Sequence, residues 1–427
     1  MARGLPAALA GWRQQYGDLV HLRMWPEHQL VVSDPQLVRE LLVTQHDALV
    51  RWERGIGIFA YLQGNSVLIA EGGPWVAKRH ALQPAFAPKS VQAFVATIAA
   101  AAGDAMERWQ PGAAMPVERE LTALTMDVIM RMMFSSAIGG DARSAERAVH
   151  DAMLAGNAEM FWPASWPDWM PWKRRKRAVR TLLTGLIDRH LQARLALPAE
   201  AWPSDLLTRL LALHLVDGAA WPLDAVRDEC MTAFLAGHET TAASLTWWAW
   251  CMASNPAAQD RARREVQSVL AGRTPTDADL PALGYLLQTL NETMRLYPAA
   301  PVLMSRRSTR AMVLGGWTIP ARTMFMVPVF LMHHDQRWFP EPLAFRPERF
   351  GADAPPIPRG AFMPFGTGPR VCLGQHLALT EMTVVAAMIL QRFSLSVAPG
   401  QAAPAAELNI SLRPKQALHL QVGPAPP

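Results

Sequence analysis

One cysteine of this chain lies in a setting suited to chemistry. The stretch PFGTGPRVCLGQHLAL, residues 364–379, places Cys372 in a glycine-rich loop ahead of apolar residues at helical spacing. Free N–H groups and the dipole at a helix N-terminus favour a thiolate, which is both a nucleophile and a metal ligand. Arg370 adds a fixed positive charge, and three glycines allow close approach of a flat ligand: Gly366, Gly368 and Gly374. The alternative is a buried structural cysteine in a turn.

A second stretch places poor helix-forming residues inside a predicted helix. FLAGHETTAAS, residues 234–244, lies inside the sequence 223–255, which otherwise predicts one long helix. Gly237 costs a helix interior roughly 1 kcal/mol, and the two threonines are also poor helix formers. Such a local conflict indicates a functional site. The alternative is an exposed Glu239 beside two adjacent threonines.

Two further pairs have helical spacing. In NETMRLYP, Glu292 and Arg295 are three residues apart on one helix face, and in GPWVAKRH, Trp75 and Arg79 are four apart. Taken alone, the first is typical of a surface ion pair, and the second of a packing tryptophan with a solvated arginine.

The length and composition of the chain are sufficient for a large fold that could hold these residues in place. The chain has 427 residues, half of them apolar, which fits a globular protein with a sizeable core. A net charge of +5 is too small to imply nucleic acid, although a local basic face towards an acidic partner remains open. Three cysteines without a CxxC pair indicate a reducing, cytoplasmic setting, and no HExxH metal motif is present.

Helical patterns dominate the chain. Short strands are expected at 19–24, 29–33, 312–320, 323–330 and 418–422, and a helix capped by Ser33 or Asp34 follows the second. The uncharged run 240–259 is interpreted as the buried part of the long helix, and the methionine-rich run 126–134 as core filling. With no Gly/Ser linker, we predict one domain, 1–427, mainly α with small β-sheets.

FGTGPRVCLG, residues 365–374, resembles the haem-binding signature of the cytochrome P450 family at every fixed position. The resemblance implies a cytochrome P450 fold, with haem b between the long central helix and the helix after the cysteine. It makes Cys372 the axial thiolate of the haem iron, with Phe365 packed beside the sulfur and Gly374 at the end of the signature. Thiolate ligation favours O–O cleavage.

Four other stretches follow in the family's order, so the resemblance runs from about residue 19 to 423. Glu292 and Arg295 look like its ExxR helix, joined by Arg349 of FRPERF in a network that positions the cysteine loop. Residues implied to hold the haem propionates are Trp75, Arg79, Arg370 and Arg306, with Arg307 nearly as plausible as Arg306.

The stretch AGHETT is similar to the family's oxygen-binding motif. By that likeness, Ala236 and Gly237 leave room for dioxygen, while Glu239 and Thr240 relay protons to it. His238 occupies the variable position, where we expect a packing or hydrogen-bonding role.

The resemblance thus implies a haem-thiolate monooxygenase of the soluble bacterial type, which hydroxylates or epoxidises a hydrophobic small molecule with O2. No transmembrane anchor and no fused reductase are seen in the sequence, so electrons from NAD(P)H are expected through a ferredoxin or flavodoxin-type donor, and a monomer is expected. The alternatives are a peroxide-dependent enzyme, an isomerase or dehydratase, and, more remotely, a non-enzymatic haem sensor.

The substrate itself is not specified by the sequence. A mostly apolar pocket is expected from seven residues: Ile56, Phe59, Ala233, Phe234, Val302, Leu303 and Ile410. The tryptophan-rich segment 161–172 leaves three interpretations open, which are a packed loop, a hydrophobic gate and a membrane-docking segment.

Overall fold

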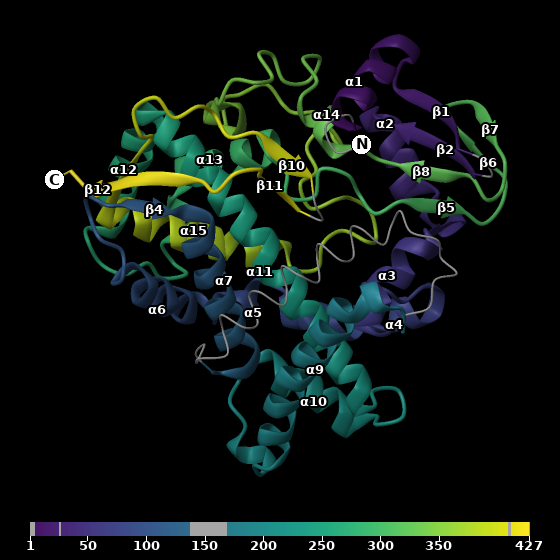
Figure 1. The fold of residues 1–427 in the computed structure, drawn as a ribbon, viewed down its shortest axis with the longest axis horizontal. Helices are drawn as coiled ribbons and strands as arrows, with labels where there is room; N and C mark the ends of the chain where they lie inside the picture. The colour runs from purple at the N-terminus through teal and green to yellow at the C-terminus, as the bar shows by residue number, and fades with distance from the viewer. Residues whose placement is uncertain (1–4, 25–26, 137–168, 409–410, 427) are drawn as a thin grey trace.

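The computed structural model describes residues 5–24, 27–136, 169–408 and 411–426. It is mainly helical with small sheets, as the sequence predicts (Figure 1). The α-helices are α1 (Leu5–Tyr16), α2 (Pro35–Arg39), α3 (Glu53–Gln63), α4 (Gly72–Leu82), α5 (Pro88–Gln92), α6 (Val95–Met106), α7 (Val117–Phe134), α9 (Arg174–Leu195), α10 (Leu206–Val216), α11 (Leu223–Ser254), α12 (Pro256–Leu270), α13 (Gly284–Leu296), α14 (Val329–His333) and α15 (Gln375–Arg392). The strands are β1 (Leu19–Met24), β2 (Glu27–Val32), β3 (Leu49–Arg51), β4 (Ala114–Pro116), β5 (Arg306–Ser308), β6 (Met312–Leu314), β7 (Trp317–Ile319), β8 (Met324–Met326), β9 (Phe393–Ser396), β10 (Ala406–Leu408), β11 (Leu412–Pro414) and β12 (His419–Pro424).

The long helix predicted for 223–255 is confirmed as α11, which has 32 residues and crosses the helical body (Figure 1). After Glu239 the helix carries no charged residue and is mostly buried, with Trp247 and Trp248 fully enclosed. Helices α7, α13 and α15 pack against α11, and the methionines of α7 are buried, as predicted for core filling. Function must therefore depend on the part of α11 that the core does not cover.

A five-stranded sheet occupies the other side of the molecule, in the order β1-β2-β8-β5-β3 (Figure 1). Asp34 caps α2 by accepting hydrogen bonds from the backbone N–H groups of Gln36 and Leu37. The strand expected over 323–330 ends at Met326, and α14 follows it. The cause is Pro328, which lacks an N–H for the sheet and stands just before the helix.

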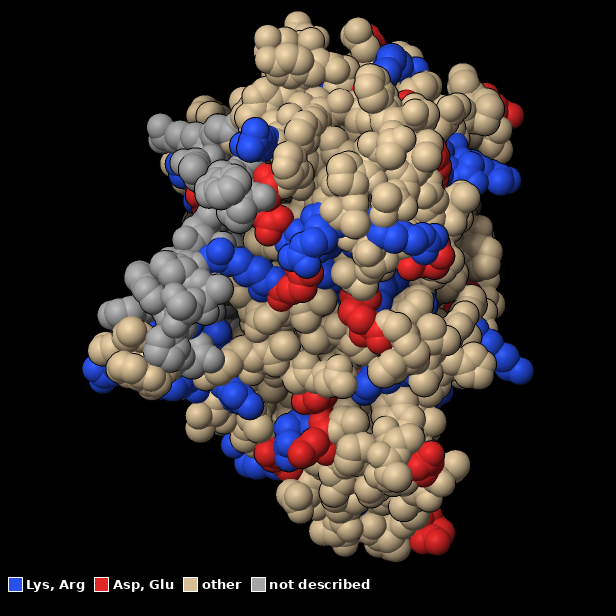
Figure 2. All heavy atoms as spheres, turned by 90° about the vertical axis from the view of Figure 1, so that its right-hand side faces the viewer, with Lys and Arg blue, Asp and Glu red and all other residues tan. Residues whose placement is uncertain are grey.

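Charged side chains of both signs mix on the outer surface. On the face in Figure 2, Lys and Arg lie beside Asp and Glu across the middle of the molecule. Within the described ranges, no helix combines the length and apolar character needed to cross a bilayer. The same ranges contain no group of three or more His, Cys, Asp or Glu side chains placed to hold a metal ion.

Candidate functional site

The cysteine loop is a tight turn that ends where α15 begins. The backbone N–H of Cys372 donates to the carbonyl of Phe365 at 2.9 Å, and this bond closes the loop. Gly366 and Gly368 have φ of 76° and 79°. A Cβ on Gly368 would lie 2.1 Å from the carbonyl oxygen of Leu42, so only glycine fits there. Gly374, the N-cap of α15, has an ordinary φ of −86° and needs no such freedom.

The thiol of Cys372 is exposed, yet dense protein surrounds it on its other sides. It therefore lies in a recess and not on the outer surface. Burial raises the pKa of Cys372, while the backbone N–H of Gly374 and the charge of Arg79 lower it in part. The sequence led us to expect that the helix N-terminus favours a thiolate. In the protein alone, desolvation outweighs that effect, and a bound cation would reverse it.

Arg370 and α4 form one wall of the site. The guanidinium of Arg370 stacks over the ring of Trp75 at 4.2 Å from its centre. Its Nη2 donates to the carbonyl of Ala70 at 3.1 Å and also binds the carboxylate of Glu71. Arg79 lies one helical turn beyond Trp75, near enough to Cys372 for each charge to affect the pKa of the other. Trp75, Arg79 and Arg370 are thus brought together.

Two more arginines meet this group across the sheet. Arg51 of β3 and Arg306 of β5 are directly opposite each other in the strand register. Like charges in that arrangement destabilise a sheet. Burial, and then the charge of Arg370, lower the pKa of Arg51 to about 9 and that of Arg306 to about 10. The arginines here outnumber the carboxylates that could neutralise their positive charge.

Several N–H groups in this cluster have no protein acceptor. Among the described residues, Nε and Nη1 of Arg51 and Nη1 of Arg370 are buried without a hydrogen-bond partner. Unsatisfied buried charge is costly, so these groups indicate an anionic ligand. The sequence analysis missed Arg51 because a single arginine at the end of a short strand carries no local signal.

Arg306 and Arg307 of β5, the two adjacent residues considered for propionate binding, lie in different surroundings. Side chains alternate along a strand, so Arg306 and Arg307 point to opposite faces. Arg307 pairs with Glu27 at 2.8 Å and with Glu53 at 2.9 Å, away from the site. Arg306 is the one that joins Arg51 and Arg370.

Glu292, Arg295 and Arg349 form a buried network. Arg295 binds Glu292 through two parallel hydrogen bonds of 2.7 and 2.8 Å, and both side chains are 0% exposed. Arg349 donates to the same carboxylate at 3.2 Å, and the backbone N–H of Arg346 donates at 2.9 Å. The pair is therefore no surface contact, which was the alternative for an isolated Glu–Arg pair.

A chain of hydrogen bonds leads from this network to the cysteine loop. Arg295 Nη1 donates to the carbonyl of His333 at 2.8 Å, and the ring of His333 accepts from the backbone N–H of Met363 at 3.0 Å. The carbonyl of Met363 in turn accepts from Gly366 in the loop. Burial lowers the pKa of His333 to about 3, which keeps its ring neutral and able to accept. The network is thereby connected to the residues that shape the loop.

One face of α11 stays uncovered at the break in its apolar pattern. Ala236 and Thr240 are exposed and Ala233 and Gly237 half-buried, at spacings of three and four residues, while the neighbouring positions are mostly buried. The hydroxyl of Thr240 donates to the carbonyl of Ala236 at 2.9 Å. A Cβ on Gly237 would lie 3.0 Å from Ile129 Cδ1, so this glycine also allows α7 to pack closely.

Glu239 and His238 point away from that face. Glu239 is buried and binds Ser411 and Arg413, which the sequence analysis did not identify. His238 Nδ1 lies 2.7 Å from the carbonyl of Phe234, and burial lowers the pKa of its imidazole. His238 thus has packing and hydrogen-bonding contacts.

The expected pocket residues are only partly brought together. Ile56, Phe59, Val302 and Leu303 are half-buried, and Leu303 lies 3.9 Å from the position of a Cβ on Gly366. Phe234 is fully buried against the ring of His238 and does not share the open face of α11. Ile410 lies outside the described residues, as do Trp162 and Trp166 of the tryptophan-rich segment. Trp169 is 70% exposed.

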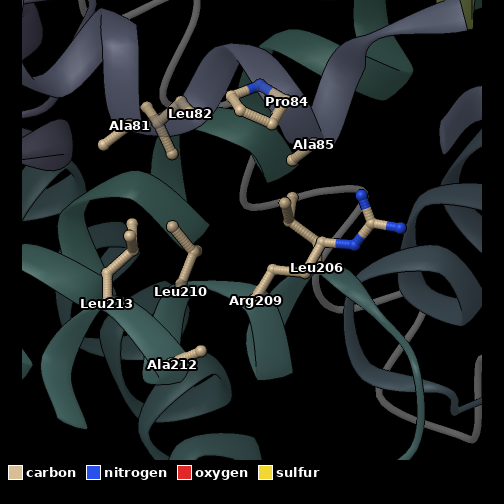
Figure 3. Close-up of a pocket in the computed structure, with 9 residues that line it drawn as sticks. All are labelled: Ala81, Leu82, Pro84, Ala85, Leu206, Arg209, Leu210, Ala212 and Leu213. Atoms are coloured by element: carbon tan, nitrogen blue, oxygen red, sulfur yellow. The ribbon is translucent and has the colours of Figure 1, made fainter. Parts of the chain in front are cut away.

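A hollow of about 210 Å³ lies elsewhere, between α4 and α10 (Figure 3). Its lining is apolar except for one arginine: Ala81, Leu82, Pro84, Ala85, Leu206, Arg209, Leu210, Ala212 and Leu213. It contains none of the chemically active residues described above.

Comparison with known proteins gives one consistent result. A sequence model of the cytochrome P450 family matches residues 4–421. Cyclooctat-9-en-7-ol 5-monooxygenase of Streptomyces melanosporofaciens is 33% identical over 90% of this chain and 84% of that protein. Cytochrome P450 734A4 of Oryza sativa subsp. japonica is 32% identical over 92% and 80%, and the chloroplastic carotene epsilon-monooxygenase of Arabidopsis thaliana is 27% identical over 91% and 77%. The chain therefore belongs to the cytochrome P450 family and is a monooxygenase.

Proposed function

We propose that residues 1–427 form a single haem domain that inserts one oxygen atom from O2 into a hydrophobic small molecule, by hydroxylation or epoxidation. Electrons from NAD(P)H reach it through a separate ferredoxin or flavodoxin-type protein. All three cysteines are free, which supports a reducing, cytoplasmic location. We propose that the protein acts as a monomer.

The arginine cluster is the observation that carries this proposal. Arg51, Arg79, Arg306 and Arg370 act on one another through their charges, with Glu71 as an acidic neighbour. Haem b carries two propionates, which match a cluster that has buried N–H groups left over. Because Arg79 also acts on Cys372, an anionic edge bound by the arginines and a metal bound by the thiol fit one flat ligand.

The residues take distinct roles in this proposal. Cys372 holds the iron, Phe365 packs beside the loop, and Trp75, Arg79, Arg306 and Arg370, with Arg51 added, hold the propionates. When bound, the haem supplies the activation of dioxygen. Ala236 and Gly237 keep the open face of α11 low in bulk, Thr240 presents a hydroxyl on that face, and Glu239 takes up protons and passes them towards Thr240.

A hydrophobic substrate is supported by the apolar character of the expected pocket residues. Ile56, Phe59, Val302 and Leu303 are apolar and half-buried, and Ala233 lies on the open face of α11. The names of two relatives refer to cyclooctat-9-en-7-ol and to carotene, which agrees with an apolar substrate.

The test uses the purified holoprotein. After reduction and exposure to carbon monoxide, we expect the strongly red-shifted Soret band of thiolate-bound haem, absent in Cys372→Ala and retained in the control Cys251→Ala. With hydrophobic compounds that shift the haem spectrum on binding, product should form with NAD(P)H and surrogate redox partners. Product formation with peroxide alone, and none with the electron donors, would refute the proposal.

A further inference from the structure

Two adjacent carboxylates near the start of α11 hold the segment that follows α3. The backbone N–H of Asn65 donates to Asp228 Oδ2 at 2.8 Å. The backbone N–H of Val67 donates to both carboxylate oxygens of Glu229, at 2.9 and 3.1 Å. Gly64, the C-cap of α3, packs so closely on Asp228 that a Cβ there would overlap the carboxylate. The end of α3 is therefore fitted to this place on α11.

Glu229 joins a third element to this contact. Its carboxylate also accepts from Lys78 Nζ of α4 at 2.9 Å, and the side chains of Glu229 and Lys78 are 3% and 13% exposed. In a buried ion pair, the loss of either partner leaves an uncompensated charge. Lys78 is adjacent to Arg79, which the proposed function assigns to a haem propionate. Glu229 thus connects α11, residues 64–67 and α4 at one point.

The contact lies at one end of the open face of α11. One side of the helix carries four residues at spacings of four, three and four: Glu229, Ala233, Ala236 and Thr240. The last three are half-buried or exposed, whereas Glu229 is 4% exposed beneath residues 64–67. Residues 64–67 therefore close the open face at its N-terminal end.

Helix α3 has a second contact, with α9. The ring of Tyr61 has Lys176 Nζ at 4.1 Å and the guanidinium carbon of Arg180 at 4.8 Å from its centre. Cations over an aromatic face are attracted by its negative charge density. Ile56 and Phe59, which are expected in the pocket, are on the same helix and half-buried. The contacts with α9 and α11 thus determine where these two side chains lie.

We propose that Asp228 and Glu229 are positioning residues for the substrate pocket, which hold residues 64–67 on α11 so that α3 limits the size of the molecule that reaches the haem. With both carboxylates in place, α3 stays against α11 and the open face ends at Glu229. Without them, α3 moves outward more readily and a larger molecule passes. The inference rests on the proposed function, because it takes α3 and the open face of α11 as the lining of the substrate site.

The experiment compares two azole probes of different size on the holoprotein, with imidazole as the small probe and clotrimazole as the bulky apolar one. Both bind haem iron through a ring nitrogen and shift the Soret band, so stopped-flow absorbance gives their association and dissociation rates. In Asp228→Ala and Glu229→Ala, both rates of clotrimazole should rise about 10–100-fold, because hydrogen bonds to a charged acceptor no longer oppose the movement of α3. The rates of imidazole should stay at wild-type values, because a molecule of this size does not need that movement.

Conservative variants and a neighbouring carboxylate serve as controls. Asp228→Asn and Glu229→Gln keep an oxygen that accepts the backbone N–H, so they should restore most of the wild-type rates. Asp224→Ala removes a carboxylate one turn earlier on α11, whose side chain is 81% exposed and pairs with Arg227. This variant should change the rates of neither probe.

Haem content and thermal unfolding of each variant separate positioning from folding. Glu229→Ala leaves Lys78 buried without its carboxylate and should lose stability, whereas Asp228→Ala keeps that ion pair and tests the same segment. If both azoles change equally in Asp228→Ala, or if clotrimazole keeps its wild-type rates there, the inference is wrong. If neither azole shifts the Soret band of the wild-type protein, the proposed function fails first.

Discussion

Glu292→Ala tests whether the buried network positions the cysteine loop. Glu292 accepts four hydrogen bonds, two from Arg295, one from Arg349 and one from the backbone of Arg346. Its loss leaves the guanidinium of Arg295 fully buried with no carboxylate beside it. Breaking one partner of such a pair costs about 3–5 kcal/mol. A typical domain has a free energy of unfolding of only about 5–15 kcal/mol, so most of the margin would be lost.

The loss should also be visible in the haem content. Arg295 binds the carbonyl of His333, which holds Met363 next to the loop, so the variant should yield little holoprotein. Haem per protein and thermal unfolding by circular dichroism, at one scan rate, measure both effects. The matched control is Arg346→Ala, whose pair with Glu341 is exposed on both sides and is expected to contribute only about 0–1 kcal/mol. Normal haem content and melting temperature in Glu292→Ala would refute the role of the network.

Three further changes test the site. Arg51→Leu should release haem to a scavenger protein about 10–100-fold faster, the equivalent of a charged hydrogen bond of about 1.5–3 kcal/mol. The haem-free variant should gain thermal stability, because the repulsion between Arg51 and Arg306 is relieved. A loss of stability in the haem-free variant would contradict the assignment. Thr240→Ala should keep haem and substrate binding but divert electrons to peroxide, which a peroxide assay beside product analysis detects, and unchanged coupling would exclude the role of the hydroxyl. Burial lowers the pKa of His333 to about 3 in the folded protein, whereas its ordinary pKa is 6.5. Between these two pH values, only the unfolded chain carries a proton on this imidazole. Its contribution should reduce the free energy of unfolding by about 1.4 kcal/mol for each pH unit below about 6.5, and His333→Gln should lose that slope in urea titrations from pH 7 to pH 4.

Local sequence determined the elements that carry the chemistry. The cysteine loop, the break in α11 and the Glu292–Arg295 spacing are patterns within about ten residues, and each depends on backbone rules that act over the same distance. For this reason α11, α13 and α15 could be predicted with the side chains they present. A helix fixes which residues share a face before any tertiary contact forms.

Tertiary structure decided the partners of those side chains. The convergence of Arg51 with Arg306, and the side of the sheet on which Arg307 lies, depend on the register of β3 against β5, which are far apart in the sequence. The contact of Arg413 with Glu239 depends on the packing of β11 against α11. A one-residue change of register turns every side chain to the other face, and no local pattern specifies it. The charge state of Cys372 was decided in the same way, because its desolvation comes from the whole of the surrounding protein and outweighs the helix N-terminus that the sequence reveals.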